Sequence, residues 1–106
     1  MDKITIWHNA RCSKSRKTLS LIEDHGFKPE VVRYLESPPS LPDLERVIQL
    51  LGCGPRDILR TKEAAYTELN LATESDERKL MQAMVDNPVL IERPIVVCGD
   101  RAAIGR

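Results

Sequence analysis

Residues 4–16 have the sequence ITIWHNARCSKSR, and this segment says more about the chain than any other. Its first four residues form an apolar run that predicts a short buried strand. From Ser13 onward the pattern becomes helical, with Gly26 as the predicted stop. Cys12 therefore falls where a strand passes into a helix N-terminus, where free backbone N–H groups and the positive end of the helix dipole gather. Such a place favours the thiolate form of a cysteine and can bind an anion beside it.

Length and composition limit what the chain can be. It has 106 residues with 16 basic and 16 acidic side chains, which predicts a single domain spanning residues 1–106. With zero net charge, the chain has no overall electrostatic field that would attract nucleic acid or an anionic membrane. No apolar run approaches the roughly 20 residues that cross a bilayer. Three widely spaced cysteines (Cys12, Cys53 and Cys98) predict neither a disulfide framework nor a zinc site. We therefore expect a cytoplasmic protein without a metal or a bound cofactor.

The remaining pattern predicts β-α-β, a helical insert and a terminal β-β hairpin. Strands are expected at residues 3–7, 30–34, 94–98 and 102–104, a first helix at 13–25, and insert helices that begin near Ser40, Pro55, Ala64 and Ser75, with Ser40 and Ser75 as N-caps. The first two strands should be parallel with a right-handed crossover, and the last two antiparallel. This order predicts an α/β, thioredoxin-like fold with a mixed four-stranded sheet and flanking helices. That fold normally has one further helix after the hairpin.

Two interpretations exist for Cys12. A small buried core thiol is the commonest fate of a free cysteine, but the neighbours Arg11, Ser13 and Lys14 favour a reactive thiol at a partly exposed position. Ser15 stands where a second cysteine would complete a C-x-x-C motif, so Cys12 cannot close a disulfide across this turn. The Ser15 hydroxyl is expected either to donate a hydrogen bond to the thiolate or to serve only the helix backbone.

Two polar residues precede Cys12 at the end of the predicted strand. His8 is either an imidazolium that favours the thiolate or a polar residue that hydrogen-bonds within the loop. Asn9 is expected to organise the turn through its side-chain amide.

Arginine is abundant, and most arginines are expected on the solvated surface, namely Arg11, Arg16, Arg33, Arg46, Arg56 and Arg78. Three others differ in position: Arg60 ends a short helix, Arg93 precedes Pro94 at a strand start, and Arg106 ends the return strand. In a thioredoxin-like fold the loop before the third strand packs against the catalytic turn, and its proline is often cis. Arg93 is therefore expected near Cys12, with a guanidinium suited to bidentate capture of a phosphate-like oxyanion.

Four motifs, taken in order along the chain, resemble the glutaredoxin-coupled arsenate reductase family. They are HNxxCxxSR at residues 8–16, YLExPPS at 34–40, LR at 59–60 and NPxLIxRPIVV at 87–97. The resemblance covers essentially the whole chain. It implies that the Cys12 thiolate attacks arsenate, that glutathione reduces the resulting adduct, and that glutaredoxin resolves the mixed species to release arsenite.

The resemblance also implies roles for individual residues. Arg60, Arg93 and Arg106 match the oxyanion-binding arginines of that family, and His8 and Ser15 match positions that tune the thiol. Asn9 and Pro94 would be structural.

Ala10 departs from the family pattern, because relatives usually have a proline after His-Asn, and this predicts a looser turn. Two other functions also fit the sequence. One is a glutathione-dependent thiol oxidoreductase paralogue that acts on another substrate. The other is an RNA-polymerase-binding regulator of the same fold, although its redox-sensing members usually carry the C-x-x-C pair that Ser15 interrupts here.

Overall fold

The computed structural model describes residues 3–105 and divides the chain into two units, which we describe separately. The sheet unit comprises Met1–Ser37 and Arg93–Arg106, and the helical unit comprises Pro38–Glu92. The helical unit corresponds to the insert that the sequence predicts between the second strand and the terminal hairpin.

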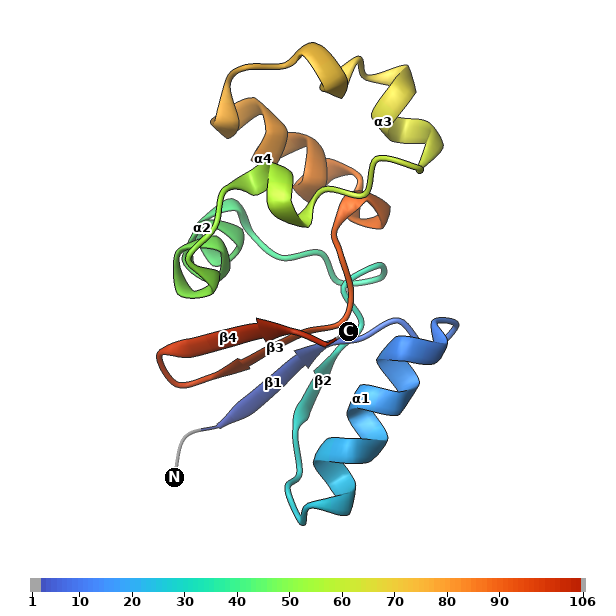
Figure 1. Cartoon of the computed structure of the whole chain (residues 1–106), viewed down its shortest axis with the longest axis vertical. Helices are drawn as coiled ribbons and strands as arrows, with labels where there is room; N and C mark the ends of the chain where they lie inside the picture. The colour runs from blue at the N-terminus through green and yellow to red at the C-terminus, as the bar shows by residue number, and fades with distance from the viewer. Residues whose placement is uncertain (1–2, 106) are drawn as a thin grey trace. The chain divides into compact units, whose positions relative to one another are not determined.

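The sheet unit contains four strands in the order β2-β1-β3-β4. The strands are β1 (Ile4–Trp7), β2 (Glu30–Val32), β3 (Ile95–Cys98) and β4 (Arg101–Ile104). β2 runs parallel to β1, β3 runs antiparallel to β1, and β4 runs antiparallel to β3. The predicted α/β fold with a mixed four-stranded sheet is therefore confirmed, although β2 ends two residues earlier than predicted (Figure 1).

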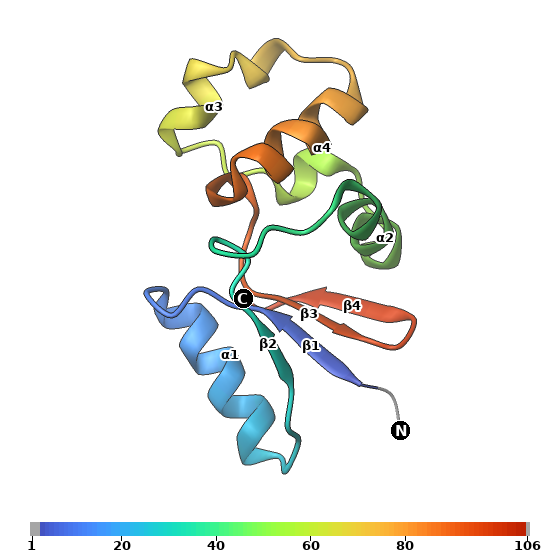
Figure 2. The same ribbon diagram turned by 180° about the vertical axis from the view of Figure 1, so that it is seen from behind.

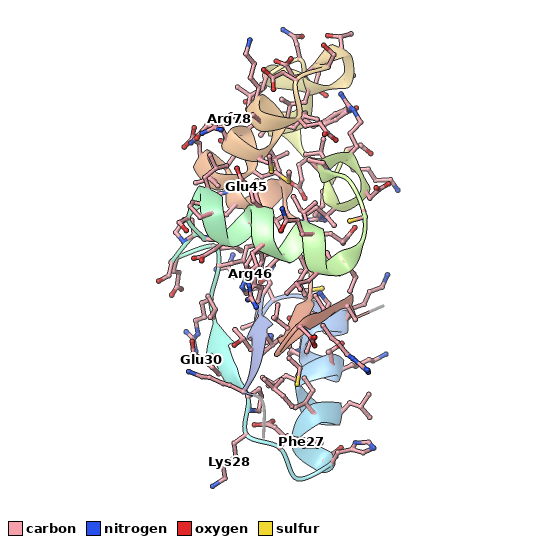
Figure 3. All side chains as sticks on the ribbon, turned by 90° about the vertical axis from the view of Figure 1, so that its left-hand side faces the viewer. Phe27, Lys28, Glu30, Glu45, Arg46 and Arg78 are labelled. Atoms are coloured by element: carbon pink, nitrogen blue, oxygen red, sulfur yellow. The ribbon has the colours of Figure 1, made fainter. Side chains whose placement is uncertain are left out.

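Helix α1 (Ser13–Asp24) joins β1 to β2 and lies along one face of this sheet (Figures 1 and 2). It ends one residue before the predicted boundary, and Gly26 follows with φ of +85°, a conformation that glycine adopts without steric cost. Phe27 and Lys28 lie in the connection that returns to Glu30 on β2 (Figure 3). The compact α1 connection accounts for the parallel pairing of β1 and β2.

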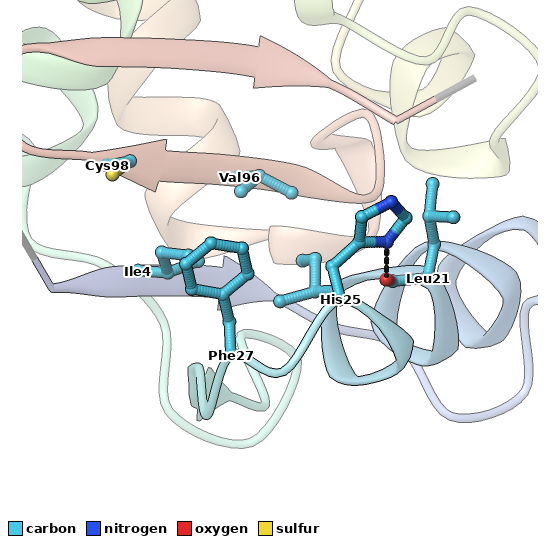
Figure 4. A pocket seen from close by; sticks show the side chains of 7 residues that line it. Ile4, Leu21, His25, Phe27, Val96 and Cys98 are labelled. Carbon is cyan, nitrogen blue, oxygen red and sulfur yellow. Dashed lines mark hydrogen bonds between the residues drawn. The ribbon is translucent and has the colours of Figure 1, made fainter.

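An open apolar groove lies between α1 and the sheet (Figure 4). Ile4, Val96 and Cys98 line it from β1 and β3, and Leu21 and Phe27 line it from α1 and the connection that follows. The Leu21 and Phe27 side chains are 59% and 45% exposed. Side chains beside this groove are therefore partly exposed to solvent, whereas Ile6 of β1 and Ile95 of β3 are fully buried.

The helical unit is built from short helices. They are α2 (Leu41–Leu51), η1 (Pro55–Ile58), α3 (Ala64–Glu68), η2 (Leu71–Thr73), α4 (Glu77–Asp86) and η3 (Pro88–Leu90). As predicted, the Ser40 hydroxyl caps α2 by accepting a hydrogen bond from the Asp43 N–H. α2 packs on α4, and the buried Leu44 and Met84 each contribute about 1.5–3 kcal/mol through removal of apolar surface from water. No helix within residues 3–105 has the length and apolar character to span a membrane.

Within the helical unit, backbone hydrogen bonds join two segments that are distant in the sequence. The sequence pattern did not predict this pairing. Leu59 and Ile91 form an isolated antiparallel bridge, flanked by hydrogen bonds from the Arg60 N–H to Leu90 O and from the Glu92 N–H to Ile58 O, both 2.8 Å. The bridge joins the segment after η1 to the segment after η3.

The predicted N-cap of α4 is wrong by one residue. Asp76, not Ser75, is the cap, and its carboxylate accepts a hydrogen bond from the Arg78 N–H at 2.9 Å. A carboxylate is the better cap here, because its negative charge also interacts favourably with the positive end of the helix dipole.

Replacement of this cap should lower the stability of the protein. We expect Asp76→Ala to decrease the free energy of unfolding by about 0.5–2 kcal/mol, because it removes the acceptor of the Arg78 N–H. Ser75→Ala, one residue away, is the matched control and should leave the urea midpoint nearly unchanged. Equal effects of the two substitutions in urea unfolding would contradict the assignment of the cap.

Candidate functional site

The turn between β1 and α1 is held by backbone and amide hydrogen bonds. The His8 N–H donates to Val32 O at 2.8 Å, so the β1–β2 pairing continues past the end of β1. Asn9 Oδ1 accepts from the Arg11 N–H at 3.0 Å, and Asn9 O accepts from the Cys12 N–H at 3.0 Å. The Asn9 side chain and backbone thus each hold one N–H group of the turn.

The Ser15 hydroxyl ties the end of β1 to the first turn of α1. Ser15 Oγ lies 2.6 Å from His8 Nδ1 and accepts a hydrogen bond from the Asn9 N–H at 3.0 Å. Ser15 is fully buried, and His8 is only 7% exposed. The hydroxyl therefore serves His8 and the backbone of the turn, and the group of Ser15 that acts on Cys12 is its backbone N–H.

Cys12 occupies the N-cap position of α1 with an extended backbone (φ −94°, ψ 122°), and its side chain is half-buried. Partial burial raises the pKa of the Cys12 thiol, but hydrogen bonds from the Ser15 and Lys14 N–H groups, together with the charge and the hydrogen bond of Arg93, outweigh that effect. The pKa of Cys12 consequently lies below its ordinary value. A helix N-terminus with a neighbouring guanidinium is the environment in which thiolates form.

His8 is not the imidazolium that one interpretation of the sequence assumed. Burial lowers the pKa of His8, and the positive charges of Arg33 and Arg16 lower it further. The neutral ring is therefore favoured at pH 7. The stabilising positive charge beside the Cys12 thiol comes from Arg93 instead.

Within the sheet unit, Arg93 lies close enough to Cys12 for its guanidinium to lower the pKa of the thiol through its charge and a hydrogen bond. Arg93 precedes the buried Pro94, and the peptide bond between them is cis, as the fold led us to expect. Pro94 O accepts a hydrogen bond from the Gly105 N–H at 2.8 Å, which joins this loop to the end of β4.

The other two predicted oxyanion-binding arginines are located differently. Arg60 belongs to the helical unit, where its guanidinium forms an ion pair with Glu63 at 2.7 Å, and its role toward an oxyanion stays a prediction. Arg106 lies outside the described residues. The six arginines predicted to be on the surface are all exposed: Arg11, Arg16, Arg33, Arg46, Arg56 and Arg78.

The environment of Cys53 is opposite to that of Cys12. Burial raises the pKa of the Cys53 thiol, and the negative charge of Asp57 raises it further, so the neutral thiol is favoured there.

Within residues 3–105, no group of three or more His, Cys, Asp or Glu side chains is arranged to hold a metal ion. A thiol with a lowered pKa beside several hydrogen-bond donors, as at Cys12, has the chemistry to act as a nucleophile toward an anion.

Comparison with known proteins agrees with this geometry. Residues 7–106 match the ArsC family. The chain belongs to the ArsC family. Among its relatives is "Uncharacterized protein YfgD" of Escherichia coli K12, which is 52% identical over 106 residues, with 98% of this chain and 89% of the relative covered.

Two further relatives are named arsenate reductases. An arsenate reductase of Neisseria meningitidis serogroup A is 45% identical over 108 residues, which cover all of this chain and 92% of that protein. The solved structure of an arsenate reductase from Vibrio cholerae superposes with a TM-score of 0.95 at 47% identity, over 99% of this chain and 91% of the other. These similarities confirm the thioredoxin-like fold and the family resemblance that the motifs predicted.

Removal of the Arg93 charge should raise the pKa of Cys12. We expect Arg93→Gln to move the pH midpoint of Cys12 alkylation by iodoacetamide upward, since the guanidinium stabilises only the thiolate. Below the midpoint, each unit of increase would slow alkylation at a fixed pH by about tenfold. Arg101→Gln, an exposed arginine on β4, is the control and should leave the profile unchanged. An unaltered profile for Arg93→Gln would exclude Arg93 as the source of the shift.

The lowered pKa of His8 makes a specific prediction for stability in acid. The unfolded chain takes up a proton near pH 6.5, whereas folded His8 does so only at lower pH, so folding loses stability as pH falls through that window. We expect the unfolding free energy of the wild type to fall toward that of His8→Asn between pH 7.5 and 5.5, by at most about 1.4 kcal/mol per pH unit. Urea titrations of both proteins measure this difference. A difference that is constant with pH would mean that His8 titrates normally.

Proposed function

We propose that this chain is an arsenate reductase and that the Cys12 thiolate is its only nucleophile. The observation that carries the proposal is the Cys12 thiol itself, whose pKa is lowered by two backbone N–H groups and by Arg93 in spite of partial burial. The similarity to arsenate reductases of Neisseria meningitidis and Vibrio cholerae supports arsenate as the substrate. Ser15 at the position of a second cysteine supports a cycle in which external thiols supply the electrons.

The first chemical step joins sulfur to arsenic. Cys12 Sγ attacks the arsenic atom, a sulfur–arsenic bond forms, and one arsenic–oxygen bond breaks, so that the oxygen leaves as water once it is protonated. Arsenate is mostly a dianion at neutral pH, and the attacking thiolate meets its negative charge. The Arg93 guanidinium and the N–H groups at the start of α1 offset this repulsion as charge accumulates in the transition state. Loss of one such donor typically costs about 3–4 kcal/mol of transition-state stabilisation.

The remaining steps transfer two electrons to arsenic. Glutathione displaces a second oxygen as water, which leaves arsenic(V) bonded to both Cys12 and the glutathione sulfur. A glutaredoxin thiolate attacks that glutathione sulfur, so a disulfide forms, the sulfur–arsenic bond breaks, and its electron pair stays on arsenic, which becomes arsenic(III). Water then hydrolyses the bond to Cys12 and releases arsenite. Overall, arsenate and two thiols give arsenite, one disulfide and one water.

Several residues have supporting roles in this proposal. Arg93 binds the oxyanion beside Cys12. The oxyanion-binding roles of Arg60 and Arg106 rest on the family resemblance alone and stay predictions. His8 and Ser15 are positioning residues, since their mutual hydrogen bond holds the turn from which the Ser15 N–H reaches the thiol.

Replacement of the three cysteines tests this proposal. We expect Cys12→Ser to abolish arsenite formation in an assay with glutathione and glutaredoxin, because a serine hydroxyl is not ionised at this pH and cannot replace the thiolate. Cys53→Ser and Cys98→Ser are matched controls and should keep most of the wild-type rate. Turnover by Cys12→Ser would exclude the mechanism.

The wild-type protein should also depend on both thiols. Omission of glutaredoxin should reduce the rate, and omission of glutathione should abolish it. If the wild-type protein forms no arsenite under any of these conditions but reduces another glutathione-reactive substrate, the thiol oxidoreductase alternative is correct.

A further inference from the structure

A second cavity of the sheet unit lies beside the catalytic turn and has no role in the chemistry described so far. It has a volume of about 660 Å³ and is lined by His8, by Val31 and Val32 of β2, and by residues that follow β2. β1 and β2 are parallel, so their carboxyl ends lie at the same edge of the sheet. Residues at both of these carboxyl ends line the cavity.

The cavity has one positive and one negative side chain, contributed by a hydrogen-bonded turn. Arg33 O accepts hydrogen bonds from the Glu36 N–H at 2.9 Å and from the Ser37 N–H at 2.8 Å, and all three side chains line the cavity. Neither Arg33 nor Glu36 forms an ion pair with another side chain in the described part of the chain. A guanidinium and a carboxylate in one small cavity match the carboxylate and the ammonium group of an amino acid.

His8 belongs both to the wall of this cavity and to the hydrogen bonds of the turn that carries Cys12. His8 lines the cavity and hydrogen-bonds to Ser15 in the first turn of α1, the turn that begins at Cys12. The charge of Arg33 lowers the pKa of His8, so Arg33 lies close enough to act on this ring. A ligand held by Arg33 would therefore lie next to the catalytic turn.

We propose that this cavity binds the γ-glutamyl end of glutathione, with the α-carboxylate on Arg33 and the α-ammonium on Glu36. The inference rests on the proposed function for its choice of glutathione as the thiol co-substrate. Leu19, Val31 and Val32 supply an apolar wall for the glutamyl methylene groups. The cavity volume lies within the usual range of about 300–1,000 Å³ for small-molecule sites. Arsenate itself is a poor occupant, because the Glu36 carboxylate would repel a dianion.

A binding experiment without arsenate and without glutaredoxin tests this site directly. S-methylglutathione, which lacks a reactive thiol, is titrated into the wild-type protein and its variants, and binding is followed by calorimetry and by amide NMR shifts. We expect Arg33→Gln and Glu36→Gln each to increase the Kd by about tenfold or more, since each removes a hydrogen bond to a charged group. Lys28→Gln, an exposed cation of the same unit in the connection after α1, is the matched control and should leave the Kd unchanged.

Fragments of glutathione define which end is recognised. γ-Glutamylcysteine methylated at sulfur should keep most of the affinity, and S-methylcysteinylglycine should lose it. Equal affinity of the two fragments, a Kd that is unchanged in Arg33→Gln, or the absence of millimolar binding to the wild type would each overturn the assignment.

Kinetics separate this inference from the proposed function. If both are correct, Arg33→Gln raises the KM for glutathione and leaves the KM for arsenate and the pH profile of Cys12 alkylation unchanged. Arsenite formation with a normal glutathione KM in Arg33→Gln would overturn only the cavity assignment. Arg33-dependent binding of S-methylglutathione in a protein that forms no arsenite would overturn only the arsenate reductase function.

Discussion

The hydrogen bonds of the Ser15 hydroxyl are the constraint on which the site depends. In a fully buried position, one oxygen atom links the His8 ring at the end of β1 to the Asn9 N–H in the turn. The backbone N–H of the same residue reaches the Cys12 thiol. Loss of the hydroxyl would leave both the His8 nitrogen and the Asn9 N–H unsatisfied in a buried region, which costs about 1–3 kcal/mol per group. One side chain thus fixes the path of the turn, while its backbone stabilises the thiolate.

Arg93 acts on the same sulfur from another part of the sheet unit. It reaches the site from the start of β3, which pairs with β1 in the centre of the sheet. The Gly105 N–H donates to Pro94 O, so the end of β4 is joined to the loop that carries Arg93. The sheet therefore brings together groups that are more than 80 residues apart in sequence, and the contribution of Arg93 to the thiolate exists only when both parts are folded.

The sequence predicted those features that local chemistry determines. A strand followed directly by a helix placed Cys12 at a helix N-terminus, and the Ser40 cap followed from its spacing to Asp43. The protonation of His8 was not predictable, because it depends on burial and on Arg33, a residue 25 positions away that only the folded sheet brings close. The cap of α4 was misplaced because Ser75 and Asp76 are both good cap residues, and only the backbone geometry selects between neighbours. The role of the Ser15 hydroxyl depends on its burial, for which the sequence pattern gave no signal.

The positive charge beside Cys12 belongs to an arginine and not to a histidine, and this has a chemical consequence. An imidazolium at His8 would lose its proton within the physiological pH range, and its effect on the thiolate would be lost with it. A guanidinium side chain is charged throughout the pH range in which proteins are folded, and backbone N–H groups do not titrate at all. Neutral His8 can then serve as a hydrogen-bonding partner for Ser15 without adding a charge that varies with pH. The reactivity of the thiol should therefore follow the ionisation of Cys12 alone.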